Sequence, residues 1–355
     1  MKIGNLDIEK KLFLAPMAEV TDASFRKIAR ENGAGFTFTQ MVSAAGVVNN
    51  NFETLRLLSF NRSEKPIGVQ VLGNNPDILG EAVKEIAKLK PDLIDLNCGC
   101  PVDKVVSNNM GSALLEDTKT IGRIVRKMTD SSGGIPISVK LRLGKDKSNI
   151  NILETAKAAE ANGASLLFVH ARTRADKYES EPNWEWLKKV KENLSIPIVG
   201  NGSIFTPGDA KEMLDLTGCD SVMVARGALG NPFIFNRFNN LISTGIDPGL
   251  PEPGFVKDVL LRQISYLHKE FGEILCIDKA KKHSIWYFRF YPGIDHFLEK
   301  VFSLNDLASI NSLIEEHSEN IIKGNFKVTE LSDINKKFKK KVLFWLTDID
   351  AEILG

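Results

Sequence analysis

Residues 66–99 read PIGVQVLGNNPDILGEAVKEIAKLKPDLIDLNCG and predict a strand, a helix and a second strand in succession. The outer segments, PIGVQVLG at 66–73 and LIDLNCG at 93–99, are short apolar runs, as buried parallel strands tend to be. The segment between them, DILGEAVKEIAKLK at 77–90, has the length of a crossover helix. This unit predicts a parallel sheet that is covered by helices.

The same alternation extends from residue 12 to about residue 240. Eight apolar runs stand between helical segments: LFLAP (12–16), FTFTQM (36–41), PIGVQVLG (66–73), LIDLNCG (93–99), PISVKLRLG (136–144), LLFVHAR (166–172), PIVGNGS (197–203) and SVMVAR (221–226). Eight strands that alternate with helices predict a (β/α)8 TIM barrel, an α/β fold. A doubly wound sheet usually has fewer strands and a GxGxxG after the first, whereas here the first strand runs into PMAEVTD.

The character of the sequence changes after Phe238. ISTGIDPGLPEPG (242–254) is rich in Pro and Gly and predicts a linker, and three helical segments follow: VKDVLLRQISYLHKEFG (256–272), KAKKHSIWYFRFY (279–291) and LASINSLIEEHSENIIK (307–323). We therefore predict a barrel domain at residues 1–241 and a smaller all-helical domain at residues 250–355. The lysine-rich run at 336–341 lies in a C-terminal extension and is interpreted as an exposed helix face.

Charge and composition exclude several classes of protein. The 355 residues include 46 Lys and Arg against 45 Asp and Glu, a formal net charge of +1, so any RNA or DNA site must be a local patch. No apolar run approaches the roughly 18 residues of a membrane helix, and Pro16 interrupts the segment where a secretory signal would be continuous. Four cysteines are too few for a disulfide scaffold, and Cys98 and Cys100 are too close for a typical bridge. We expect a reduced, cytoplasmic protein.

Polar and reactive residues stand at the predicted carboxyl ends of the strands, where barrels build their active sites. A lysine such as Lys140 inside a strand-like run is costly in a barrel unless it pairs with an anion or a polar ligand, and the alternative is a strand exit that faces water. Zinc at Cys98 and Cys100 would need further Cys or His ligands at matched spacing, which the sequence lacks. For either cysteine the alternative to thiol chemistry is a small buried hydrophobe.

Two glycine-containing segments predict a phosphate site. NGSIFTPGD (201–209) and ARGALGNPF (225–233) follow predicted strands seven and eight, where barrels often bind phosphate through exposed amides and a short helix. Arg226 can add a charged clamp. Glycines also serve simple turns, so each segment alone is weak, but the two together favour phosphate. With Asn97, a cysteine, Lys140 and His170 at neighbouring strand ends, the residues suggest redox or proton-transfer chemistry on a phosphorylated ligand.

These blocks resemble the tRNA-dihydrouridine synthase (Dus) family, flavin enzymes that reduce uridine in RNA. The most specific match is IDLNCGCPVDKVVSNNMGSALL (94–115). Further blocks match in the family's order: LAPMAEVTDASFR (14–26), GVQVLGN (68–74), SVKLRLG (138–144), FVHARTR (168–174), VGNGSI (199–204) and VARGALGNPFIF (224–235). The match is dense over residues 10–240 and weaker through KKHSIWYFRFYPG (281–293), where Arg289, Phe290 and Tyr291 depart from the family's small or glycine-containing stretch.

Position by position, the resemblance implies that Cys100 is the catalytic residue, since Cys98 falls in a variable slot. It implies a bound flavin mononucleotide (FMN), with His170 beside the flavin and the target base. The implied FMN contacts are Pro16, Met17, Ala18, Gln70, Lys140, His170, Asn201, Gly202, Ser203, Ala225 and Arg226. The implied substrate contacts are Asn97, Lys282, His283 and Arg289.

The implied reaction produces 5,6-dihydrouridine in tRNA, with a hydride from flavin N5 to uracil C6 and a proton from Cys100 to C5. NADPH or NADH reduces the flavin and leaves before RNA enters. Lys140 stabilises negative charge at the flavin and His170 contacts a carbonyl of the base. The target uridine must be flipped out or lie in a loop.

For the helical region, the resemblance implies an RNA platform in which basic and aromatic residues interleave: Lys279, Lys281, Lys282, His283, Arg289, Trp286, Tyr287 and Phe288. The residues alone favour a packed amphipathic helix with a solvated basic face. We expect no membrane association, no stable protein partner and a monomer.

Two other functions stay open. A flavin barrel reductase for a small enone or orotate-like molecule would share the phosphate site, but would not explain the Asn97–Ser112 block or the basic-aromatic region. A non-enzymatic RNA-binding protein would carry no flavin and would purify without a yellow colour. The sequence identifies neither the uridine that is modified nor whether ribosomal RNA is a substrate.

Overall fold

A barrel of eight parallel strands forms the first part of the computed structural model, which describes residues 1–4, 6–177 and 180–326. The strands are β3 Leu12–Leu14, β4 Thr37–Phe38, β6 Ile67–Leu72, β7 Leu93–Cys98, β8 Ile137–Arg142, β9 Leu166–His170, β10 Ile198–Asn201 and β11 Ser221–Val224. They pair in the order β3-β11-β10-β9-β8-β7-β6-β4, and a parallel bridge between Phe13 and Phe36 joins the two ends. The prediction of a (β/α)8 barrel is confirmed.

The second strand is shorter than the sequence predicts. Only Thr37 and Phe38 of the run at 36–41 form β4, and the chain pairs again with β6 as the separate β5, Val42–Ser43. Between them the chain turns toward the loop after β3, where the side-chain oxygen of Gln40 accepts a hydrogen bond from Glu19 N–H at 2.7 Å. Ahead of the barrel, β1 Lys2–Ile3 and β2 Leu6–Asp7 form an antiparallel pair.

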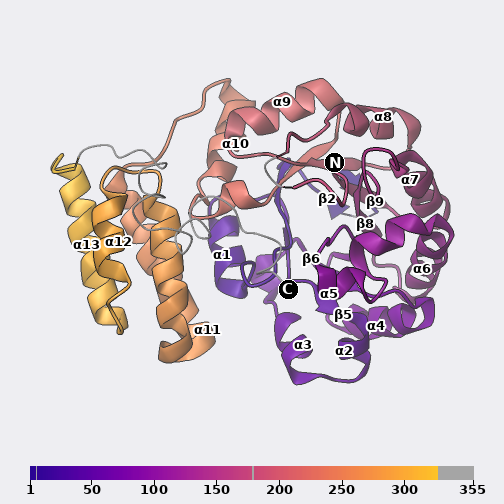
Figure 1. Ribbon diagram of the computed structural model, residues 1–355, viewed down its shortest axis with the longest axis horizontal. Helices are drawn as coiled ribbons and strands as arrows, with labels where there is room; N and C mark the ends of the chain where they lie inside the picture. The colour runs from indigo at the N-terminus through magenta and orange to yellow at the C-terminus, as the bar shows by residue number, and fades with distance from the viewer. Residues whose placement is uncertain (5, 178–179, 327–355) are drawn as a thin grey trace. The chain divides into compact units, whose positions relative to one another are not determined.

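Helices cover the outside of the barrel. Figure 1 shows helices that follow one another round it: α4 Pro76–Lys88, α6 Thr118–Ser131, α7 Ile152–Ala161, α8 Glu185–Asn193 and α9 Pro207–Thr217. The helices α1 Ala23–Glu31 and α10 Ile234–Thr244 precede and follow them in the chain. The connections after the strands hold α2 Ala44–Val48, α3 Phe52–Leu57 and α5 Asp103–Val106, with the 3₁₀ turns η1 Arg62–Glu64, η2 Gly111–Glu116 and η3 Arg226–Ala228.

Four phenylalanines fill the middle of the barrel. Phe13, Phe36, Phe38 and Phe168 are 0% exposed, and the ring centroids of the pairs in contact lie between 5.1 and 6.4 Å apart. Because β9 is not a neighbour of β3 or β4, the contacts of Phe168 cross the interior. Gly68 makes room for this layer, since a Cβ there would lie 2.4 Å from the Phe38 ring. The close packing excludes water, so buried polar side chains on the strands, such as Gln70 and Asp95, bond to one another.

The described chain divides into two compact units. Residues 1–227 and 235–247 form the first, and residues 228–234 join the second, which begins again at residue 248. Within the second unit Phe233 lies edge-on to Tyr287, with ring centroids 6.1 Å apart. This contact holds the segment at 228–234 among the helices.

Within the described residues, the second unit contains the helices α11 Pro253–Phe288, α12 Ile294–Val301 and α13 Leu307–Ile322, which lie side by side (Figure 1). A positive φ of 73° at Gly272 breaks α11 at the end of the first predicted helix. The helical character of this region is confirmed, and the lysine-rich run at 336–341 lies outside the described residues. Of the helices in the described ranges, none combines the length and apolar character needed to span a membrane.

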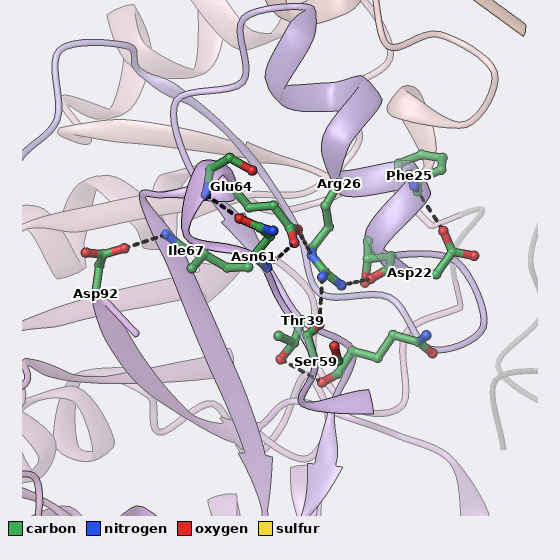
Figure 2. A network of polar contacts seen from close by, with 12 residues as sticks. Asp22, Phe25, Arg26, Thr39, Ser59, Asn61, Glu64, Ile67 and Asp92 are labelled. Atoms are coloured by element: carbon green, nitrogen blue, oxygen red, sulfur yellow. Dashed lines mark hydrogen bonds and ion pairs between the residues drawn. The ribbon is translucent and has the colours of Figure 1, made fainter. Parts of the chain in front are cut away.

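A buried ion pair fastens α1 to the chain ahead of β6 (Figure 2). Arg26 Nε donates to Glu64 Oε2 at 2.7 Å, and the other guanidinium nitrogens donate to the carbonyls of Thr21 and Ser59. The second carboxylate oxygen of Glu64 accepts the N–H of Asn61. The two charged side chains are only 2% and 6% exposed, so they depend on each other rather than on water.

Removing one partner of this pair should destabilise the fold. Glu64→Gln leaves the buried guanidinium without its counter-charge, and we expect the free energy of unfolding to fall by about 3–5 kcal/mol. The matched control is Glu53→Gln, which removes one partner of the exposed Arg56–Glu53 pair and should change stability by less than about 0.5 kcal/mol. Urea denaturation measures both, and equally small losses would contradict the prediction.

Candidate active site

The parallel register brings polar side chains of neighbouring strands to one end of the barrel. Asn97 on β7 pairs with Lys140 on β8, and His170 on β9 pairs with both Arg142 and Asn201. These positions stand at or near the carboxyl end of each strand. Sequence positions that are about a hundred residues apart therefore share one site.

An open pocket of about 790 Å³, its mouth included, lies over these strand ends. Its walls contain the predicted residues Pro16, Met17, Ala18, Gln70, Asn97, Cys100, Lys140, His170, Asn201 and Ala225. The predicted Gly202, Ser203 and Arg226 follow directly in the chain. Sequence reasoning missed Arg142, which also lines the pocket. The sequence did contain a signal for Arg142, since it follows Lys140 by two residues in a strand and such residues lie on the same face.

The backbone around Cys100 is fixed from both sides. Asn97 Oδ1 accepts hydrogen bonds from the N–H groups of Gly99 at 3.0 Å and Cys100 at 2.9 Å. The N–H of Ser112 donates to the Cys100 carbonyl at 2.9 Å. Cys100 is half-buried on the pocket wall, whereas Cys98 is 0% exposed. Of these two thiols, only that of Cys100 is open to the pocket.

The Cys100 thiol keeps its proton at neutral pH. Burial raises its pKa above the ordinary value for cysteine, while the Val102 N–H and the charges of Arg142 and Lys140 lower the pKa by less. Thiolates are the nucleophilic form of cysteine, and thiols are the form that can give up a proton. The electrostatics therefore favour proton donation over nucleophilic attack.

Two cations from β8 face the same space. Burial lowers the pKa of Lys140 to about 8, with a smaller contribution from Arg142, so the ammonium is still largely protonated at neutral pH. Arg142 Nε donates to the Gly99 carbonyl and Nη1 to the Thr173 carbonyl, each at 2.8 Å. Arg142 thereby ties the Cys100 loop to the segment after β9.

His170 is a neutral donor rather than an imidazolium. Burial, followed by the charges of Arg142, Lys140, Arg172 and Arg226, holds its pKa well below the ordinary value. Its Nε2 lies 3.2 Å from Arg172 Nη1. A guanidinium only donates, so Nε2 accepts and the neutral ring carries its hydrogen on Nδ1.

The loops after β10 and β11 have the backbone geometry of an anion cradle. Gly202 and Ser203 have positive φ angles of 137° and 53°, and neither N–H has an acceptor among the described residues. Successive backbone N–H groups of this kind bind anions. The loops approach closely at Gly227, where a Cβ would lie 2.1 Å from the Ile204 carbonyl oxygen. Arg226 brings positive charge to the same place and lies 5.3 Å from the centroid of the Phe205 ring.

Comparison with known proteins adds the family. The model of the dihydrouridine synthase (Dus) family matches residues 13–323. This chain belongs to the dihydrouridine synthase family. The resemblance carried by the sequence blocks is thereby confirmed.

Two relatives of this Dus chain match over most of their length. It is 38% identical over 290 residues to tRNA-dihydrouridine synthase B of Pasteurella multocida, covering 81% of this chain and 86% of that protein. It is 32% identical over 326 residues to a probable tRNA-dihydrouridine synthase of Rickettsia conorii, covering 92% and 98%. Among solved structures, 6-hydroxypseudooxynicotine amine oxidase from Pseudomonas geniculata is similar with a TM-score of 0.55 at 14% identity, over 74% of this chain and 52% of that chain. The last similarity concerns the fold alone.

The helical unit of the Dus chain does not present the predicted stacking surface. Trp286, Tyr287 and Phe288 are 2%, 1% and 0% exposed, so the expectation that they stack on RNA bases is wrong. The physical reason is the packing of α11: Phe288 contacts Phe297 of α12 and His317 of α13.

The basic residues predicted for RNA contact in the helical unit divide into two groups. His283 is 2% exposed and lies 3.3 Å from the amide of Gln263, inside the unit. Lys282 is half-buried, with Nζ 4.9 Å from the Trp286 ring centroid. Arg289 is also half-buried and donates to the Leu229 carbonyl at 3.1 Å. Lys279, Lys282 and Arg289 keep exposed area, whereas Lys281 and His283 are 7% and 2% exposed, so the expectation that these two contact RNA is wrong.

Because Gly111 has no side chain, the Cys100 loop can pack directly against it. A Cβ there would lie 2.8 Å from the Cys100 carbonyl oxygen, and φ is +59°. We expect Gly111→Ala to shift the loop, because the added methyl group clashes and the backbone is strained at this φ. As a result, the iodoacetamide alkylation rate of Cys100 should change several-fold or more. Mass spectrometry after timed alkylation measures this rate.

Gly133→Ala is the matched control, because Gly133 also has positive φ, +65°, but a Cβ there meets nothing within 4 Å. It carries the backbone strain without the clash and should leave the Cys100 rate unchanged. Equal rate changes in the two variants would mean that a general loss of stability, and not the clash at Gly111, alters the rate at Cys100.

Proposed function

We propose that this chain reduces specific uridines of tRNA to 5,6-dihydrouridine, with FMN as its bound cofactor and NADPH or NADH as the reductant. The observation that carries the proposal is a protonated thiol, Cys100, that shares one pocket with Lys140 and His170 beside an anion cradle. The names of the two relatives, which are matched over 86% and 98% of their length, support tRNA as the substrate.

The residues of the pocket fit FMN. A half-buried ammonium and a buried amide, Lys140 and Gln70, suit a ring with carbonyl and nitrogen acceptors. The N–H groups of Gly202 and Ser203, which have no acceptor in the described part of the chain, suit a phosphate. Pro16, Met17 and Ala18 would hold the ring, while Asn201, Gly202, Ser203, Ala225 and Arg226 would hold the ribityl phosphate. When bound, the flavin supplies the hydride that enters uracil at C6.

The chain's own groups then manage the proton and the charge. Cys100 gives its proton to C5 and afterwards regains one from water. The Lys140 ammonium and the Nδ1–H of His170 stabilise the negative charge that develops on the ring and carbonyl groups. Asn97 holds the Cys100 loop with its oxygen and can contact the base with its second Nδ2 hydrogen.

RNA binding is assigned to residues 250–355 and catalysis to residues 1–241. A base stacked in a duplex cannot enter a pocket at the mouth of a barrel, so the target uridine must be flipped out or lie in a loop. We propose phosphate contacts by Lys282 and Arg289. His283 is left out of this surface because it is buried.

Cys100→Ala should separate the two half-reactions. Flavin retention and reduction by NADPH need no thiol and should persist, whereas dihydrouridine formation loses its general acid and should slow by about 10²–10⁴-fold. Single-turnover oxidation of the pre-reduced protein by unmodified tRNA measures the loss. Cys98→Ala is the control, since that side chain does not reach the pocket, and it should stay largely active. A slow Cys98→Ala with a normal Cys100→Ala would reverse the assignment.

Arg226→Ala should weaken FMN retention. Losing a charge-assisted contact to phosphate costs about 1.5–3 kcal/mol, which corresponds to roughly tenfold or more in Kd. Fluorescence titration of the apoprotein with FMN measures the change. Arg123→Ala, on the exposed face of α6, removes the same charge elsewhere and should leave the affinity unchanged. An Arg226→Ala protein that binds FMN as tightly as the control would remove this residue from the phosphate site.

A further inference from the structure

A carboxylate lies buried beneath the pocket without lining it. Asp95 on β7 is 0% exposed, and both of its oxygens accept short hydrogen bonds. Oδ1 accepts the hydroxyl of Ser138 on β8 at 2.6 Å, and Oδ2 accepts the amide Nε2–H of Gln70 on β6 at 2.7 Å. The three side chains stand at one level, because Asp95 is the register partner of both Gln70 and Ser138.

The hydrogen bonds continue from Gln70 to the Cys100 loop. Gln70 Oε1 accepts Nδ2–H of Asn97 at 2.8 Å, and Asn97 Oδ1 accepts the N–H groups of Gly99 and Cys100. Asn97 follows Asp95 by two residues on the same strand and therefore lies on the same face. One chain of donors and acceptors thus runs from the buried carboxylate to the backbone of the reactive thiol.

We propose that Asp95 is a positioning residue that sets the orientation of the Gln70 and Asn97 amides and thereby the position of the Cys100 thiol. The proposal rests on the proposed function only in giving Cys100 a catalytic role.

The direction of the chain follows from what each group can do. A carboxylate accepts and does not donate, so the Gln70 amide must turn its nitrogen toward Asp95 and its oxygen toward Asn97. Asn97 must then turn its nitrogen toward Gln70, which leaves its oxygen for the two backbone N–H groups. At the far end these N–H groups can only donate, so both ends of the chain require the same orientation. A flipped Gln70 would set oxygen against oxygen at Asp95 and nitrogen against nitrogen at Asn97.

The charge of Asp95 is held in place by the same neighbours. Burial raises its pKa to about 6, while the bonds from Ser138 and Gln70 and the charge of Lys140 oppose that rise. The carboxylate is therefore largely ionised at neutral pH and acts as an acceptor on both sides.

The proposal is tested by exchanging the donor and the acceptor of the hydrogen bond between Gln70 and Asp95. Gln70→Glu sets a second carboxyl group against Asp95, and at a pH high enough to ionise both groups we expect the iodoacetamide alkylation rate of Cys100 to change by about tenfold or more. In the double variant Gln70→Glu/Asp95→Asn, the amide introduced at position 95 donates to the carboxylate introduced at position 70, whose other oxygen still accepts from Asn97. This variant should return to within about threefold of the original rate.

Asp95→Asn alone is the control for charge. The oxygen of the introduced amide can accept from Gln70 and its nitrogen can donate to the Ser138 hydroxyl, so the rate at Cys100 should stay within about threefold. Fragment-ion mass spectrometry on the full-length protein assigns the label to Cys100. The other cysteines, Cys98, Cys219 and Cys276, are at most 5% exposed.

The proposal fails if Gln70→Glu leaves the rate unchanged, or if the double variant is no nearer the original rate or no better folded than Gln70→Glu. A general loss of structure cannot imitate the expected result, because a second substitution at the same link restores it. Alkylation needs neither RNA nor flavin. If these substitutions change the alkylation rate of Cys100 as expected but the protein makes no dihydrouridine, the proposed function is refuted and the role of Asp95 stands.

Discussion

Closure of the barrel by parallel pairing is the constraint on which the site depends. The last pairing joins β3 to the chain at Phe36, where Gly35 N–H donates to the Leu12 carbonyl and Leu14 N–H to the Phe36 carbonyl, both at 2.9 Å. Once the sheet is closed, no strand can slide without breaking the ladders on both of its sides. A slip of one residue in β8 would turn Lys140 out of the barrel and put Leu141 in its place.

Closure also separates an apolar layer from a polar layer. The phenylalanine rings exclude water from the middle of the barrel, so the polar groups above them are bonded to one another: Asp95 to Ser138 and Gln70, and Asn97 to the Cys100 loop. The same burial has opposite effects on acids and bases. It raises the pKa of the Cys100 thiol and lowers the pKa of Lys140 and His170. As a result, a thiol that holds its proton lies beside a neutral imidazole and a cation that loses its charge as the pH rises through about 8.

The helical unit illustrates where a residue pattern misleads. Interleaved basic and aromatic residues at 279–291 are compatible both with a surface that stacks on bases and with a packed helix. Packing on α12 and α13 buries Phe288, and His283 lies against Gln263 within α11. Lys279, Lys282 and Arg289 retain exposed area. No local pattern in residues 279–291 reveals which face is buried, because the contacts come from Phe233, from Gln263 in the first half of α11 and from the helices that follow.

The sequence by itself determined the strand–helix alternation, the barrel, the helical region after it and the identity of most pocket residues. These follow from local patterns: apolar runs of strand length, the spacing of glycines, and residue blocks that resemble one family. Only the tertiary structure decided which side chains form hydrogen bonds with one another. Gln70 and Asp95 are 25 residues apart, and Arg142 and Gly99 are 43 apart. Their contacts depend on strand register and side-chain packing across the barrel, and a pattern read along the chain does not encode which side chains meet once the sheet has closed.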